Sequence, residues 1–142
     1  MTVLELRSVS KVHGRGAAEV QALRDVSLTV AAGEMVAIMG PSGSGKSSLL
    51  TIAGTLEEPT SGAVFIQGKD TLSLSGGARS RLRRRTIGYV FQDYNLLPGL
   101  TAAENVSLPL ELDRWPARKA RAAGLAALEE LGLADWAERY PD

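Results

Sequence analysis

Apolar and polar residues alternate over the first part of the chain, a pattern typical of β-strands with one buried face. Residues 3–6 mark one candidate strand and residues 23–30 mark a second. The stretch 14–16, with a glycine at each end, predicts a loop or hairpin between them. Residues 35–39 are continuously apolar, which predicts instead a strand buried on both faces of a parallel sheet.

Directly after this run, the spacing of apolar residues becomes helical. Residues 48–53 predict a helix that ends at Gly54, because glycine is a favoured C-terminal stop. The elements predicted from there to residue 92 are a turn at 59–62, a strand at 63–66, a turn at 68–70, a basic helix at 73–85 and a strand at 87–91.

The pattern is mainly helical after Asn95. Thr101 is a candidate N-cap, and Glu104 three residues later completes a capping box. Trp115 and Pro116 open a second helix rich in alanine and leucine, which we expect to end at Gly132. Its apolar positions at helical spacing are Leu125, Leu128 and Leu131. Strands therefore dominate up to about residue 92, and helices dominate after it.

The turn between the buried strand and the first helix carries a phosphate-binding motif. Residues 40–47 read GPSGSGKS and fit G-x-x-x-x-G-K-[ST] at every fixed position. Glycines let backbone N–H groups point inward at an anion, and the helix N-terminus favours negative charge. Lys46 would reach the β- and γ-phosphates, and the Ser47 hydroxyl would ligate Mg²⁺. The alternative is a glycine-rich turn with a chance lysine.

Composition excludes several classes of protein. The 142 residues carry 16 basic and 16 acidic side chains and no net charge, so charge gives no argument for binding nucleic acid. There is no cysteine, hence no disulfide or thiolate metal site. The first residues lack the pattern of a signal peptide, and no apolar stretch approaches the ~20 residues that span a bilayer.

These segments together resemble the ATP-binding subunit of an ABC transporter along the whole chain. The segments that carry the resemblance are 33–40, the loop 40–47, and then 59–62, 84–92, 95–98 and 100–106. The last two resemble the branch that serves macrolide-export and lipoprotein-release permeases. The resemblance implies an α/β fold: an ABC-type P-loop NTPase core with an N-terminal antiparallel β part, the phosphate loop and the Q-loop over residues 1–95. Residues 96–142 would be the first part of a helical, permease-contacting subdomain.

The same resemblance implies roles for residues in this sequence. Gln92 matches the Q-loop glutamine, which reaches a Mg²⁺-bound oxygen; the alternative is a surface glutamine after a strand. His13 stands where the family usually has an aromatic residue that stacks on adenine, and a solvated loop histidine is equally consistent. Val20 would pack on the other side of the base, or is a strand core residue. The expected cofactor-binding residues are Gly40, Pro41, Ser42, Gly43, Ser44, Gly45, Lys46, Ser47, Ser48, His13 and Val20, with Lys46 and Gln92 catalytic and Ser47 and Gln92 on the metal.

The implied function is to couple ATP binding and hydrolysis, with Mg²⁺, to substrate movement by a membrane permease. The subunit would work as a dimer on the cytoplasmic face of the cell membrane, held there by the permease, and without nucleic acid. Alternatives are an ABC-type ATPase of DNA repair or translation, and a nucleotide-binding fragment without hydrolysis. The transported substrate and the direction of transport are not specified.

Several family features are missing from the sequence. Leu74-Ser75-Gly76-Gly77 resembles the ABC signature but precedes Gln92, so we interpret it as a turn or helix cap. No Mg²⁺-binding aspartate with an adjacent glutamate base follows, and no switch histidine. We therefore expect the N-terminal part of a longer subunit, an incomplete fold and little or no ATP turnover by the 142 residues alone. The arginines within residues 79–85 are expected to form a solvated face.

Overall fold

The computed structural model describes residues 1–14 and 16–141 of the chain. They form two compact units, Met1–Ile87 and Gly88–Asp142. The first holds the strands and the phosphate-loop motif, and the second holds two longer helices. The division at residues 95 and 96 expected for the two functional parts stays a prediction.

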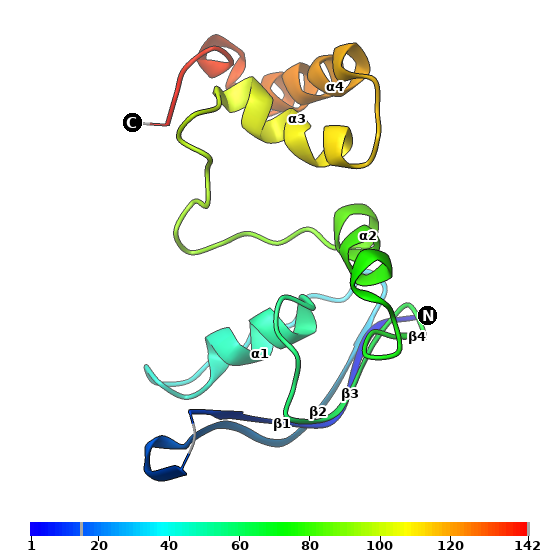
Figure 1. Ribbon diagram of the computed structural model, residues 1–142, viewed down its shortest axis with the longest axis vertical. Helices are drawn as coiled ribbons and strands as arrows, with labels where there is room; N and C mark the ends of the chain where they lie inside the picture. The colour runs from blue at the N-terminus through cyan, green and yellow to red at the C-terminus, as the bar shows by residue number, and fades with distance from the viewer. Residues whose placement is uncertain (15, 142) are drawn as a thin grey trace. The chain divides into compact units, whose positions relative to one another are not determined.

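A four-stranded antiparallel sheet forms the first unit, in the order β2-β1-β3-β4 (Figure 1). Its strands are β1 (Thr2–His13), β2 (Val20–Ala31), β3 (Ser61–Ile66) and β4 (Lys69–Asp70). A short 3-10 helix η1 (Gly16–Ala18) lies between β1 and β2. The predicted strands at 3–6, 23–30 and 63–66 and the hairpin between the first two are confirmed.

Helix α1 (Lys46–Ala53) lies against one face of this sheet (Figure 1). Leu49 and Ile52 of α1 are buried in one cluster with apolar residues of three strands. The strand members of that cluster are Leu6, Val9, Leu23 and Val64. The alternating apolar residues of the strands and the helically spaced apolar residues of α1 thus form one core. This core holds the start of α1 at a fixed place over the sheet.

Two predicted strands are absent. Residues 35–39 pair with none of the described strands; Met35 is 97% exposed, and only Ile38 packs against the core. Residues 87–91 likewise have no ladder in the described part of the chain, and Val90 is 96% exposed. A strand needs a neighbouring backbone for its hydrogen bonds, and an apolar run alone does not supply one.

The expected turn at 68–70 is partly wrong. Gln67 and Gly68, with φ of 48° and 75°, form the turn, and Lys69–Asp70 pairs with β3 as β4. Two consecutive residues with positive φ make the turn type that joins tightly paired antiparallel strands.

Helix α2 (Gly76–Thr86) confirms the predicted basic helix. The Ser75 hydroxyl accepts a hydrogen bond from the Ala78 N–H at 3.3 Å, so the signature-like stretch is a helix cap. Part of the arginine cluster has structural contacts: Arg79 pairs with Glu58, and Arg83 donates to the Thr55 carbonyl at 3.0 Å. The expectation of a purely solvated face is therefore wrong for these two residues.

In the second unit, α3 (Ala102–Leu112) and α4 (Ala117–Glu130) pack together, followed by the 3-10 helix η2 (Ala134–Trp136). The predicted capping box is present, with Thr101 N–H donating to Glu104 at 2.8 Å and Glu104 N–H donating to the Thr101 hydroxyl at 3.3 Å. The Thr101 N–H holds the pKa of Glu104 below its usual range, since it stabilises the carboxylate.

Small residues set the distance between α3 and α4. Ala103 and Ser107 of α3 and Ala120 and Gly124 of α4 are all buried. A Cβ at Gly124 would lie 3.2 Å from the Ala103 carbonyl oxygen. Of the leucines predicted for the buried face of α4, only Leu128 is buried; Leu125 and Leu131 are 37% and 75% exposed. The contact face is narrower than the leucine spacing indicates because small side chains make it.

Candidate functional site: the loop at residues 40–47

The loop at residues 40–47 rests directly on strand β2. Gly45, with φ of 90°, is the residue before α1, and a Cβ there would lie 2.3 Å from the Ala22 carbonyl oxygen. Both the conformation and the lack of space require glycine at this position. The motif glycine therefore fixes how the loop meets the sheet.

Lys46 closes the loop with its own side chain. Its ammonium donates to the carbonyl oxygens of Gly40 at 2.8 Å and Pro41 at 2.7 Å. The Ser44 hydroxyl lies 3.3 Å from the same nitrogen. The positive charge is thus held over the loop by three oxygens instead of extending into solvent.

Among the described residues, no side chain caps the N-terminus of α1. Gly45 cannot supply a side-chain acceptor, and no acidic residue stands in the first turn. The first N–H groups of a helix have no partner within the helix, and the helix dipole adds partial positive charge there. Uncapped N–H groups beside an ammonium form an environment that attracts an anion.

The donor set of the loop suits a phosphate chain. The loop offers backbone N–H groups, the Lys46 ammonium and the hydroxyls of three serines, Ser42, Ser44 and Ser47, and it contains no carboxylate. Mg²⁺ is usually held by few protein ligands together with phosphate oxygens and water. A single hydroxyl such as that of Ser47 fits this requirement, and within the described residues no group of three or more metal-ligating side chains occurs.

His13 lies at the first turn of α1. Its Nε2 atom is 3.3 Å from the Ser48 hydroxyl oxygen, and its Nδ1 atom is 3.7 Å from a Glu57 carboxylate oxygen. Val20 is the cross-strand partner of His13 on β2 and is 63% exposed. The structure thus brings His13 and Ser48 together and places Val20 beside them; the exposure of Val20 is a correction to its reading as a core residue.

Sequence reasoning missed two charged residues at this place. Lys11 donates to the Glu58 carbonyl at 2.7 Å and pairs with the Glu57 carboxylate, also at 2.7 Å. Glu57 therefore stands between the Lys11 ammonium and the His13 ring. The sequence contains one indication that Lys11 lies near His13. Lys11 stands two residues before His13, which places both side chains on the same side of a strand.

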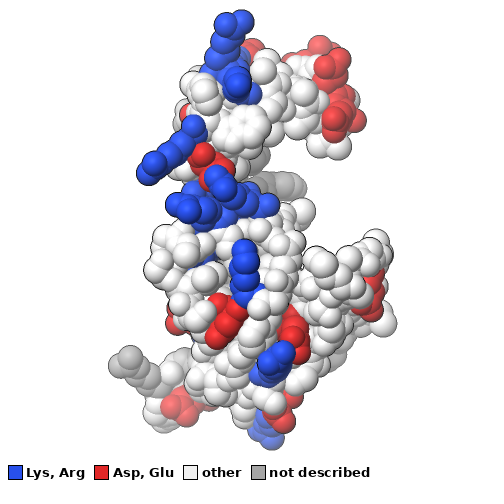
Figure 2. Space-filling model, turned by 90° about the vertical axis from the view of Figure 1, so that its right-hand side faces the viewer, with Lys and Arg blue, Asp and Glu red and all other residues white. Residues whose placement is uncertain are grey.

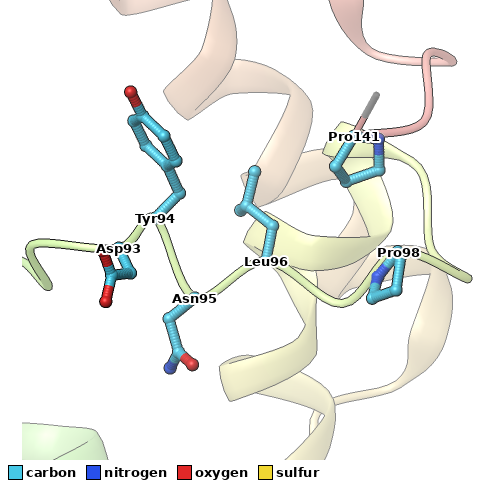
Figure 3. Close-up of a pocket in the computed structure, with 6 residues that line it drawn as sticks. All are labelled: Asp93, Tyr94, Asn95, Leu96, Pro98 and Pro141. Atoms are coloured by element: carbon cyan, nitrogen blue, oxygen red, sulfur yellow. The ribbon is translucent and has the colours of Figure 1, made fainter.

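Gln92 belongs to the second unit and is exposed, at a bend of the chain. A hollow of about 580 Å³ follows it, lined by Asp93, Tyr94, Asn95, Leu96, Pro98 and Pro141. Figure 3 shows Asp93 and Tyr94 on one side of this hollow and Pro98 and Pro141 on the other. Asn95 is followed by a segment tied to α3, because Asn105 accepts from the Leu97 N–H at 2.8 Å and donates to its carbonyl at 3.1 Å.

Charged side chains of both signs lie on the surface of the described residues. Figure 2 shows a largely white face, with one group of blue side chains near the middle of the view and red side chains in several smaller groups. Among the helices of the described residues, none is both long and apolar enough to cross a membrane.

Comparison with known proteins agrees with the geometry of the loop. The ABC transporter family model matches residues 23–142. An uncharacterized ABC transporter ATP-binding protein of Thermotoga maritima is 46% identical over 99% of this chain. The lipoprotein-releasing system ATP-binding protein LolD of Bordetella avium is 46% identical over 97% of the chain. This chain spans 60% of the length of each of these two relatives.

Two further proteins extend the comparison. The macrolide export ATP-binding/permease protein MacB of Rhodopseudomonas palustris is 48% identical over 99% of this chain, which covers 22% of MacB. The solved dimeric structure of the ATP-binding cassette MJ0796 bound to ADP and Pi is 40% identical, with a TM-score of 0.89. It is matched over 97% of this chain and 61% of its own. The expected fold class and the resemblance to the macrolide and lipoprotein branch are confirmed, and this chain belongs to the ABC transporter family.

Proposed function

We propose that this chain is the nucleotide-binding part of an ATPase subunit that drives substrate movement by a membrane permease. The observation that carries the proposal is the uncapped start of α1 beside the Lys46 ammonium, on a loop without carboxylates. This arrangement attracts a phosphate chain on physical grounds. The names of the relatives LolD and MacB refer to lipoprotein release and macrolide export. They support a transporter over an ABC-type ATPase without a permease.

In this proposal Lys46 leaves the Gly40 and Pro41 carbonyls and donates instead to the β- and γ-phosphates of ATP. The N–H groups of residues 43–48 would surround the phosphates, and the Ser47 hydroxyl would hold Mg²⁺; the resemblance adds the Gln92 amide oxygen as a second ligand. Mg²⁺ held there would neutralise charge on the phosphate oxygens. His13, beside Ser48, and its cross-strand partner Val20 would contact the base, and the relative MJ0796, solved bound to ADP and Pi, supports a nucleotide as the ligand.

The permease would contact the second unit. Tyr94, Leu96 and Leu97 are 88%, 51% and 48% exposed and lie close together in sequence, and a group of exposed apolar side chains is a feature of protein–protein contact sites. They lie at or next to the hollow that follows Gln92. A permease segment in that place would couple the position of Gln92 to transport. The dimer of MJ0796 supports pairing of two ATPase subunits. The pair would lie on the cytoplasmic face of the cell membrane, held there by the permease.

Co-purification from detergent-solubilised membranes of the source cell tests whether the protein binds a permease. The tagged protein is expected to recover one integral membrane protein in a stable complex, and Leu96→Asp is expected to lose it. Glu111→Gln, an exposed change on α3, serves as the control. Stable recovery with ribosomes or DNA instead would contradict the proposal and favour an ABC-type ATPase without a permease.

A further inference from the structure

The imidazole of His13 is held at both of its nitrogen atoms. Nε2 lies 3.3 Å from the Ser48 hydroxyl oxygen, within hydrogen-bond distance. Nδ1 faces the Glu57 carboxylate at 3.7 Å, which is too long for a hydrogen bond. Both contacts lie at the edge of the ring, so neither of them uses a ring face.

Glu57 is itself held in place. Its carboxylate accepts from the Lys11 ammonium at 2.7 Å, and the same ammonium donates to the Glu58 backbone carbonyl at 2.7 Å. The Lys11 side chain is only 13% exposed, so this pair is less screened by water than a surface ion pair. Val12 N–H, from the residue between Lys11 and His13, donates to the Thr60 hydroxyl at 3.0 Å. The turn after α1 is thereby fastened to the end of β1 at several points.

The Glu57 carboxylate beside Nδ1 favours one tautomer of the neutral ring, the one that carries its N–H at Nδ1. Nε2 is then an acceptor, and the Ser48 hydroxyl donates to it. The Ser48 side chain is consequently committed to His13, which leaves its backbone N–H as the group that faces an anion at the start of α1.

We infer that Glu57, backed by Lys11, is a positioning residue that orients His13 for contact with the nucleobase. The inference rests on the proposed function, since it assumes that the loop holds the phosphates of a nucleotide. A ring anchored by its edge presents a preorganised face, and preorganisation lowers the entropy lost on binding. Histidine is the smallest of the aromatic rings that stack on bases, so its orientation contributes more to affinity than that of a larger ring would.

The test compares ATP with inorganic tripolyphosphate, which has the phosphates and no base. The chain is titrated with each at fixed pH and ionic strength, as wild type, Glu57→Gln, His13→Ala and the double variant. Glu57→Gln is expected to weaken ATP about threefold or more and to change tripolyphosphate by less than about twofold. In the His13→Ala background, Glu57→Gln is expected to add no further loss. Glu58→Gln removes the same charge one residue away and is the matched control.

A second measurement does not need a ligand. The sequence contains one histidine, so its ring nitrogens give one unambiguous set of ¹⁵N resonances. Wild type is expected to show the tautomer protonated at Nδ1, and Glu57→Gln is expected to shift this population while Glu58→Gln leaves it unchanged. The conservative variant Glu57→Asp keeps a carboxylate, so it is expected to bind ATP more tightly than Glu57→Gln does.

The outcomes separate this inference from the function beneath it. If wild type binds neither ATP nor tripolyphosphate, the proposed function fails and the inference with it. If both bind, but Glu57→Gln weakens both equally or its loss multiplies with that of His13→Ala, the positioning role is wrong and the proposed function stands. An unchanged histidine spectrum in Glu57→Gln would also overturn it.

Discussion

Gly45 lies so close to Ala22 that a Cβ on the glycine would be 2.3 Å from the Ala22 carbonyl oxygen. The contact joins the last residue before α1 to the neighbouring strand β2, with the Leu23 side chain 3.1 Å from the same point. The phosphate loop can therefore lie this close to the sheet only because Gly45 has no side chain.

Gly45→Ala is expected to distort the loop where it rests on β2. The added Cβ would meet a backbone oxygen that cannot move without β2. The alanine must also keep a φ of 90°, which costs a residue with a Cβ about 1–2 kcal/mol. We expect a loss of stability above that figure, seen as a lower midpoint of thermal unfolding, together with a loss of ATP affinity. Gly43→Ala is the control for stability, since its φ of 80° carries the same conformational cost, while among the described residues nothing beyond its chain neighbours lies within 4 Å of a Cβ there. Equal losses of stability in the two variants would show that the contact with Ala22 is unimportant.

The close approach of α3 and α4 predicts a second effect on stability. Gly124→Leu would place a side chain where Ala103 and Ser107 already lie within 3.2–3.3 Å of a Cβ, and such overpacking typically costs about 1–3 kcal/mol. Ala122→Leu on the exposed face of α4 is expected to be neutral. Chemical denaturation monitored by the helical circular dichroism signal measures both. A Gly124→Leu protein as stable as Ala122→Leu would mean that the helices separate easily.

The capping box predicts a dependence of stability on pH. Hydrogen bonds from the Thr101 N–H and hydroxyl lower the pKa of Glu104 in the folded state. Stability from this group is therefore fully present above the ordinary glutamate pKa and is lost as the pH falls through the lower, folded-state value. Denaturation measured at a series of acidic pH values is expected to show this loss in wild type and a smaller one in Glu104→Gln. Identical profiles would contradict the assignment.

The features that could be predicted from the sequence are those formed by residues close together in the chain. The caps at Ser75 and Thr101 depend on side chains within three residues of the backbone groups they bind. The loop motif is likewise contiguous, and its relation to α1 follows from the spacing alone. Alternation in β1 and β2 predicted the antiparallel hairpin because neighbouring strands there are also neighbours in sequence.

Features that depend on distant partners could not be predicted. The apolar run at 35–39 indicated burial, but which backbone pairs with it is not encoded in its own residues, and none of the described strands does. The contact of His13 with Glu57 joins the end of β1 to the turn after α1, so no short pattern contains it. Leu125 and Leu131 are exposed because α3 meets α4 through alanine, serine and glycine, which carry no hydropathic signal of comparable strength.

Turnover by the 142-residue chain is expected to be absent or very slow. Lys46, Ser47 and Gln92 would stabilise charge on the phosphates, but hydrolysis also needs a group that orients water. The sequence contains no aspartate followed by a glutamate, the pair that the resemblance assigns to Mg²⁺ and to the base. Phosphate release from ATP should match the buffer background. Robust hydrolysis that disappears in Lys46→Ala would contradict this expectation.

The most direct test of the account is the affinity for ATP of wild type, Lys46→Ala, His13→Ala and the control Lys69→Ala, measured by calorimetric titration. Lys46 supplies charge-assisted hydrogen bonds worth about 1.5–3 kcal/mol, so its removal is expected to weaken binding about tenfold or more. His13→Ala is expected to lose less, and Lys69→Ala, on β4, nothing. Saturable binding with losses in that order supports a nucleotide on the loop at residues 40–47. Binding that is unchanged in Lys46→Ala, or weakened more by His13→Ala, would contradict it.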